Sequence, residues 1–116
     1  MTIEKRKLPP MTFENTVFVG SGTEDSDQHI FRYVNEIAKL FQRSQDVVYV
    51  SGAGQAIKSV VDVAEISKRS ISDVHDVYRG IGNFVGRRKR TISKLVIGLS
   101  NKNDYEEKSE IIENQK

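Results

Sequence analysis

The sequence predicts an α/β fold, with one domain in which a mixed four-stranded sheet packs against two helices and carries a protruding basic β-hairpin. Strand-like and helical patterns alternate in the order strand, helix, strand, helix, strand, strand. The chain has 116 residues, the size of one domain with a modest core. A short turn separates the last two strands, so they must pair as an antiparallel hairpin.

The first strand is predicted at residues 16–20 and the first helix from about residue 30. Val17 and Val19 alternate with polar or small neighbours, which turns Phe18 towards the other face of the sheet. One face of the helix is apolar, through Ile30, Val34, Ile37 and Phe41 with Tyr33 and Leu40 beside them. The upstream Ser26 or Asp27 is a suitable N-cap.

Residues 47–69 predict a buried strand that is joined to an amphipathic helix. The strand covers Val47 to Val50 and is expected to end at Ser51-Gly52-Ala53-Gly54. The apolar stripe of the helix is formed by Ile57, Val60, Val61 and Ala64. Gly52 and Gly54 allow two readings. They either expose the first N–H groups of the helix to a phosphate or let the chain reverse tightly. The segment matches neither the dinucleotide nor the P-loop fingerprint.

The last two strands, about residues 74–83 and 91–99, enclose the strongest charge signal. No acidic residue occurs from Arg79 to Ser100, whereas this interval carries the cations Arg79, Arg87, Arg88, Lys89, Arg90 and Lys94. Crowded cations on an exposed turn are typical of a phosphate-binding surface. A solvated turn or a nuclear-import signal is the alternative. Phe84, at the edge of the hairpin, either stacks on an unpaired base or belongs to the core.

The two ends of the chain are expected to lie outside the folded domain. Residues 1–12 look like a flexible basic arm, and residues 102–116 look like an acidic, mainly disordered tail in which Ile111-Ile112 can form a short helical turn. The net charge of +2 is too small to be informative by itself. We expect an intracellular protein, of the nucleus or cytoplasm, because the chain lacks cysteine, a membrane-length apolar run and a secretory signal.

Enzymatic and metal-binding functions find no support in the sequence. A nucleophile and base pair would need His29 or His75 near a serine, and no spacing organises such a triad. His75 is flanked by Asp73 and Asp76, but an ordinary sheet histidine is the simpler interpretation. The carboxylates Asp62 and Glu65 are explained by helix pairing with Lys58, Lys68 or Arg69. We therefore expect no catalytic residue, metal or cofactor.

The central segment resembles the Alba superfamily. The resemblance rests on a strand, the pattern G-x-G-x-A-I and the helix V-D-V-A-E-I-S-K-R, and it extends through T-V-F-V-G and I-F-R-Y-V-N to cover residues 13–101. It implies a non-catalytic nucleic-acid-binding protein that works as a homodimer or heterodimer, with RNA favoured over DNA and little sequence specificity. The alternative is an accessory subunit of a larger enzyme complex such as ribonuclease P or MRP.

The resemblance also implies which residues bind nucleic acid. In this family the hairpin is mobile and enters a groove of the ligand, which points to Arg87, Arg88, Lys89, Arg90 and, less firmly, Arg79. The lysine-rich step of the family aligns with the acidic loop 21–29, where its two lysines and proline are replaced by Asp27, Gln28 and His29. Ala53 and Gln55 stand where archaeal members carry arginine, and Lys58 is a substitute. The acidic loop either repels a phosphate backbone or binds a basic partner. Ile66, Ile71 and Val74 either face a partner chain or complete the core.

Overall fold

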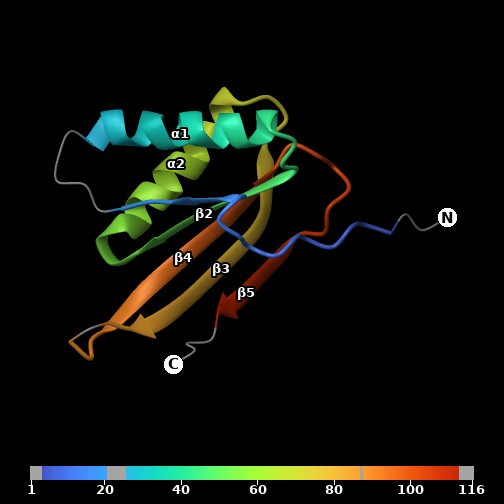
Figure 1. Ribbon diagram of the computed structural model, residues 1–116. Helices are drawn as coiled ribbons and strands as arrows, with labels where there is room; N and C mark the ends of the chain where they lie inside the picture. The colour runs from blue at the N-terminus through green and yellow to red at the C-terminus, as the bar shows by residue number, and fades with distance from the viewer. Residues whose placement is uncertain (1–3, 21–25, 87, 113–116) are drawn as a thin grey trace.

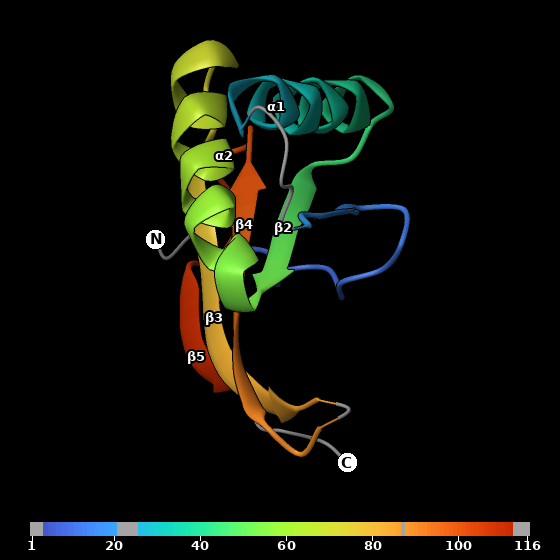
Figure 2. The same cartoon turned by 90° about the vertical axis from the view of Figure 1, so that its left-hand side faces the viewer.

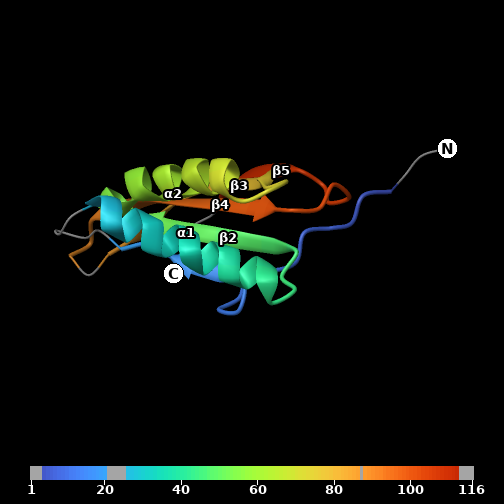
Figure 3. The same ribbon diagram turned by 90° about the horizontal axis from the view of Figure 1, so that it is seen from above.

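The computed structural model describes residues 4–20, 26–86 and 88–112, and it has two layers, a sheet and two helices that lie over one face of it (Figures 1 and 3). The elements are β1 (Thr16–Phe18), α1 (Ser26–Gln42), β2 (Val47–Ala53), the 3-10 turn η1 (Gly54–Ala56), α2 (Ile57–Ser70), β3 (His75–Val85), β4 (Thr91–Ser100) and β5 (Lys108–Ile112). The predicted α/β class and the order of the first six elements are confirmed.

The sheet has five strands in the order β1-β2-β4-β3-β5, one more than predicted. β1 is parallel to β2, β4 is antiparallel to both β2 and β3, and β5 is parallel to β3. The prediction of a disordered tail is wrong for residues 108–112, and Ile111-Ile112 form no helical turn. The segment K-S-E-I-I has no clear alternation of apolar and polar residues. It forms a strand because it pairs with β3, which is distant in sequence. Residues 113–116 lie outside the described part of the chain.

The N-terminal segment is attached to the sheet over part of its length, contrary to the prediction of a flexible arm. The Arg6 backbone N–H donates to the Asp104 carbonyl at 2.7 Å, and the Glu106 N–H donates to the Arg6 carbonyl at 2.9 Å. Leu8 packs against the second of two hydrophobic clusters. The segments before β1 and before β5 therefore hold each other in place, while residues 1–3 lie outside the described ranges.

Two hydrophobic clusters stabilise the sheet, one on each face. The larger lies under the helices and includes Val60 and Val63 of α2, both fully buried, together with apolar residues of α1 and of strands β1, β2 and β4. Val74 belongs to this cluster, and Ile66 and Ile71 pack against it. Val74 therefore completes the chain's own core, and Ile66 and Ile71 pack against that core while remaining partly exposed. The smaller cluster lies on the helix-free face and contains Val47, Tyr49, Val77, Val96 and Tyr105.

A β-bulge in β3 decides which of its side chains faces the helices. The register shifts between Asp76 and Tyr78, so Val77 has no opposite residue on β4. Val77 and Tyr78 consequently both contribute to the cluster on the helix-free face. Beyond the bulge, Phe84 lies on the helix-free face. Arg79, which pairs with the core residue Ile97, lies on the helix side.

The ends of the first helix and strand differ slightly from the prediction. α1 begins at Ser26, so part of the predicted acidic loop 21–29 is helical, while residues 21–25 lie outside the description. The prediction that Ser26 or Asp27 caps this helix concerns side chains that also lie outside the described part of the structure. β1 ends at Phe18, whose ring is 52% exposed on the helix-free face, as the alternation predicts.

Candidate nucleic-acid interface

The basic hairpin extends from the end of the molecule where β2 and β3 finish and β4 begins (Figures 1 and 2). Its turn is closed by the Gly86 N–H, which donates to the Arg90 carbonyl at 2.9 Å, and by the Lys89 N–H, which donates to the Gly86 carbonyl at 3.0 Å. Lys89 occupies the left-handed region with a φ of 57°. This tight turn projects Arg88, Lys89 and Arg90 into solvent.

These three cations form the most concentrated positive charge of the described chain. Each is exposed, and none takes part in the ion pairs formed among residues 4–20, 26–86 and 88–112. Arginine guanidinium groups bind phosphate oxygens in bidentate fashion, and the lysine ammonium adds a point charge. The prediction for Arg87 falls outside the described residues.

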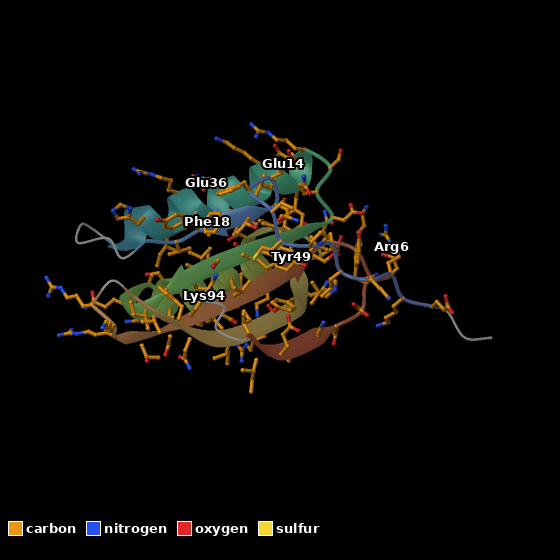
Figure 4. The ribbon with its side chains drawn as sticks, turned by 60° about the horizontal axis from the view of Figure 1, so that its bottom comes forward. Arg6, Glu14, Phe18, Glu36, Tyr49 and Lys94 are labelled. Carbon is orange, nitrogen blue, oxygen red and sulfur yellow. The ribbon has the colours of Figure 1, made fainter. Side chains whose placement is uncertain are left out.

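Lys94 and Phe84 follow the hairpin turn along the helix-free face. Lys94 pairs with Gly82 and Phe84 pairs with Ile92, so both side chains point away from the helices. Figure 4 shows Lys94 on this face together with Phe18 and Tyr49. Phe84 is half-buried and belongs to neither hydrophobic cluster. Both residues line a depression of about 470 Å³ that also includes Phe18.

Arg79 and Lys58 are separated from this basic surface. Arg79 is exposed on the helix side and lies six residues before the end of β3, which is about 20 Å along an extended strand. Lys58 is exposed in the first turn of α2. The structure therefore does not bring the predicted cations together as one group. The hairpin residues and Lys94 form one part, and Arg79 and Lys58 lie elsewhere.

The two glycines have different structural roles. β2 ends at Ala53, within the segment Ser51-Gly52-Ala53-Gly54 that was predicted to end it, but three residues later than Val50, so Gly52 is a buried strand residue. A Cβ atom at Gly52 would lie 2.5 Å from Val60 Cγ2, so α2 can pack this closely because position 52 is glycine. Gly54 has a φ of 58° and begins the turn into α2. Tight packing and chain reversal thus explain both residues.

The N-terminus of α2 has the features of a weak anion site at most. Its N-cap Ala56 makes no side-chain hydrogen bond, and its first turn contains no acidic residue. The preceding 3-10 turn, Gly54–Ala56, supplies no charged side chain. The helix end is therefore compatible with phosphate, but it lacks a cation other than Lys58.

Glu65, Asp76 and His75 have ordinary structural partners, whereas Asp62 forms none of the ion pairs among the described residues. Lys68 Nζ lies 2.8 Å from Glu65 Oε1 and 2.9 Å from Asp76 Oδ2, and its hydrogen bond lowers the pKa of Glu65. Asp76 therefore pairs with Lys68, while His75 Nδ1 lies 3.3 Å from the Asp73 carbonyl oxygen. The described ranges hold no group of three His, Asp or Glu side chains placed to bind a metal. In the same ranges, no helix is long and apolar enough to span a membrane.

Sequence reasoning placed Phe18 on the outer face of the sheet but assigned it no function. Its ring packs against that of Phe13, with centroids 5.8 Å apart, and Phe13 is 88% exposed. Two exposed phenylalanines beside a lysine-lined depression form an apolar surface that the chain itself leaves uncovered. The sequence indicated this surface in one way: Phe18 is a large apolar residue at an outward-facing position, between the inward-facing Val17 and Val19.

The fold is that of an Alba protein, and the comparisons agree. The family model Alba matches residues 15–79, more than half of the chain, and the chain belongs to this family. ALBA1 from Trypanosoma brucei is similar in structure, with 26% sequence identity, a TM-score of 0.63 and coverage of 78% of this chain and 71% of that one. Alba from Thermoplasma volcanium shares 22% identity at a TM-score of 0.48, covering 74% and 99%. No curated protein sequence matches.

Membership confirms the resemblance seen in the central segment and gives a general function. Alba proteins generally bind nucleic acids, form dimers and are not catalysts. The family match ends at Arg79, before the hairpin turn. The hairpin turn and β4 therefore lie outside the matched part of the chain.

Proposed function

We propose that this protein binds nucleic acid through its basic hairpin, with RNA preferred over DNA, and that phosphate contacts supply most of the affinity. The observation that carries this proposal is the exposed cluster of Arg88, Lys89 and Arg90, which has no acidic partner within the described residues. Phosphates are the abundant anions that such a cluster fits, and contacts to phosphates carry no sequence information. We therefore expect low sequence specificity.

A charge-matched pair of variants tests this role. The triple variant Arg88→Ala, Lys89→Ala, Arg90→Ala removes the hairpin cations. The variant Arg32→Ala, Lys39→Ala, Arg43→Ala removes two arginines and one lysine from exposed positions on or just after α1. Both lose the same net charge. We expect the hairpin variant to lose most of its affinity, whereas the control should retain it.

The salt dependence gives an independent readout. Each of the three cations is expected to neutralise one phosphate. Their removal should then make the negative slope of log K for binding against log salt concentration shallower by about 2 for a single strand. Single-stranded RNA, duplex RNA and duplex DNA of one sequence, titrated by fluorescence anisotropy, measure both the slope and the preference. Equal affinity of the hairpin variant and the wild type would refute the hairpin role, and tighter binding of DNA would refute the RNA preference.

Dimer formation is supported by an exposed aliphatic patch on the helix side of β3 and β5. Ile81, Val85 and Ile111 are 52%, 56% and 83% exposed, and Ile81 lies directly opposite Ile111 across the two strands. These side chains share one face because they occupy odd positions beyond the bulge. Asn83 lies between Ile81 and Val85 on this face, and exposed aliphatic side chains gathered in this way are typical of a protein interface. We propose that it buries against a second Alba chain.

The same patch serves either a homodimer or a heterodimer within a larger complex. Under the second alternative the protein is an accessory subunit of a nucleic-acid-processing particle of the ribonuclease P or MRP type. Light scattering after size-exclusion chromatography of the purified chain and of Ile81→Asp distinguishes the two. A wild-type dimer that Ile81→Asp converts to monomer favours the homodimer. A wild-type monomer favours the subunit role, and a dimer unaffected by Ile81→Asp would refute the assignment of the patch.

A further inference from the structure

The helix-free face of the sheet carries a depression that phosphate binding by the hairpin does not use. It has a volume of about 470 Å³ and lies between Phe18 on β1 and Phe84 on β3, with Lys94 of β4 between them. This volume is within the range of about 300–1,000 Å³ that small-molecule sites occupy. The depression is therefore large enough to take a planar ring with part of a sugar.

Small residues make the floor of the depression. Ser51, Ala53 and Gly82 occupy the centre of the face, between the large side chains at its margins. Glycine is required at position 82, since a Cβ atom there would lie 2.5 Å from the Ile112 carbonyl oxygen on β5. The hollow thus results from close packing of β3 and β5, and no described side chain of this protein fills it.

The charges on this face define where a phosphate can lie. Among the described residues that line the depression, Lys94 carries the charge and none is acidic. Lys94 also borders a second depression of about 380 Å³, which contains Glu106 and Glu110. There Tyr49 Oη donates to the Pro9 carbonyl at 2.6 Å and Tyr78 Oη donates to Glu110, so both hydroxyls have partners. Anions are therefore favoured on the hairpin side of Lys94 and disfavoured beyond it.

From this arrangement we infer that the depression binds unpaired bases of a single-stranded RNA segment, whose phosphates continue towards the hairpin. The inference rests on the proposed hairpin function. Phe18 and Phe84 supply the aromatic faces on which bases stack, and Lys94 neutralises a phosphate between them. Their strands are three spacings apart, about 14 Å across the sheet, so the face accommodates a short run of nucleotides. A duplex keeps its bases stacked within the helix and cannot use this surface.

The test compares single-stranded and duplex RNA of one sequence with a matched pair of aromatic variants. Phe18→Ala removes a ring that is 52% exposed on the helix-free face, and Phe31→Ala removes a ring that is 58% exposed on α1. Both rings lie largely in solvent, so both variants should fold. We expect Phe18→Ala to weaken single-strand binding by between about 5-fold and about 150-fold, the range of one lost stack, with duplex affinity unchanged. Phe31→Ala should bind both ligands like the wild type.

The outcomes separate this site from the hairpin. Unchanged single-strand affinity in Phe18→Ala, or an equal loss for both ligands, overturns base binding while leaving the hairpin function intact. If the triple hairpin variant keeps its affinity, the proposed function fails instead. Light scattering on Phe18→Ala tests the other possible occupant of this face, a second copy of the chain. Loss of self-association in that variant would assign the depression to a second copy of the chain and overturn RNA base binding.

Discussion

Replacement of Gly52 by alanine tests whether this residue serves packing or phosphate binding. The added Cβ would lie 2.5 Å from Val60 Cγ2 and 3.3 Å from both Ala56 Cβ and the Val19 carbonyl oxygen. Val60 is fully buried, so its side chain cannot move into solvent. Either β2 and α2 must separate, or Val60 must leave its preferred rotamer.

The expected magnitude follows from two opposing effects. Overpacking of a filled core costs about 1–3 kcal/mol. Alanine in place of glycine restricts the unfolded chain and returns about 0.4–1 kcal/mol. The packing effect is larger, so we expect Gly52→Ala to lower the free energy of unfolding by about 1–2 kcal/mol, with a fall in Tm of about 4–8 °C for each kcal/mol. Urea unfolding followed by circular dichroism measures this change.

A double variant identifies the cause. Val60→Ala removes the atom that the new Cβ meets, so Gly52→Ala should be less harmful in the Val60→Ala background, with a coupling of about 0.5–3 kcal/mol. Gly54→Ala is the control. It has a φ of 58° and an open site 3.5 Å from Ile92, so its cost comes from backbone strain and should not depend on residue 60. Additive effects of Gly52→Ala and Val60→Ala would refute the packing explanation, as would a folded Gly52→Ala variant that loses RNA affinity.

Three further predictions concern the contacts that hold the two ends of the chain against the sheet. Arg6→Ala loses the hydrogen bonds to Asp104 at 2.8 and 2.9 Å and the contact over the Tyr105 ring. Amide exchange should therefore accelerate in residues 5–11 and 104–112, while exchange in α2 should be unaffected. Unchanged exchange at both ends would show that these contacts do not hold them. The hydrogen bond from Arg6 lowers the pKa of Asp104, and the hydrogen bonds from Tyr78 and Lys108 lower the pKa of Glu110. Both carboxylates therefore stabilise the fold fully at a pH above their ordinary pKa values of 3.8 and 4.5. This stabilisation should disappear as the pH falls through the lowered pKa values, which NMR titration of residues 104–112 follows; carboxyl titration at the ordinary values would contradict it. Burial, with the charges of Glu106 and Glu110, raises the pKa of Tyr49 to about 12, so stability should fall as the pH rises from 10.0 towards that value, and Tyr49→Phe should remove one high-pH step from the phenolate absorbance.

The elements that could be predicted are those with local signals. Alternation around Phe18 and the stripes of the two helices specify their inward faces without reference to the rest of the chain. β5 could not be predicted in this way, because it is an edge strand of five residues whose order depends on pairing with β3 and on Ile112 packing near Tyr78. Such non-local contacts have no signature within a short window of sequence.

The candidate site was predictable in its charge and not in its shape. The cations of the hairpin are consecutive in the sequence, so their turn was sufficient to bring them together. Phe18 and Lys94 come from opposite ends of the domain, and their shared depression requires the order β1-β2-β4-β3. Arg79 belongs to the same acid-free interval as the hairpin cations, but its side chain lies on the other side of the sheet. Membership of one sequence interval therefore did not place it in the site.

The bulge at Val77 divides the functional surfaces of this protein. Because side chains alternate along a strand, one extra residue at this point reverses the facing of every later position of β3. Strict alternation from Asp76 without the bulge would direct Phe84 towards the helices and place Ile81 and Val85 on the opposite face. The bulge thus places Phe84 on the same face as Phe18 and Lys94, and Ile81 on the same face as Ile111.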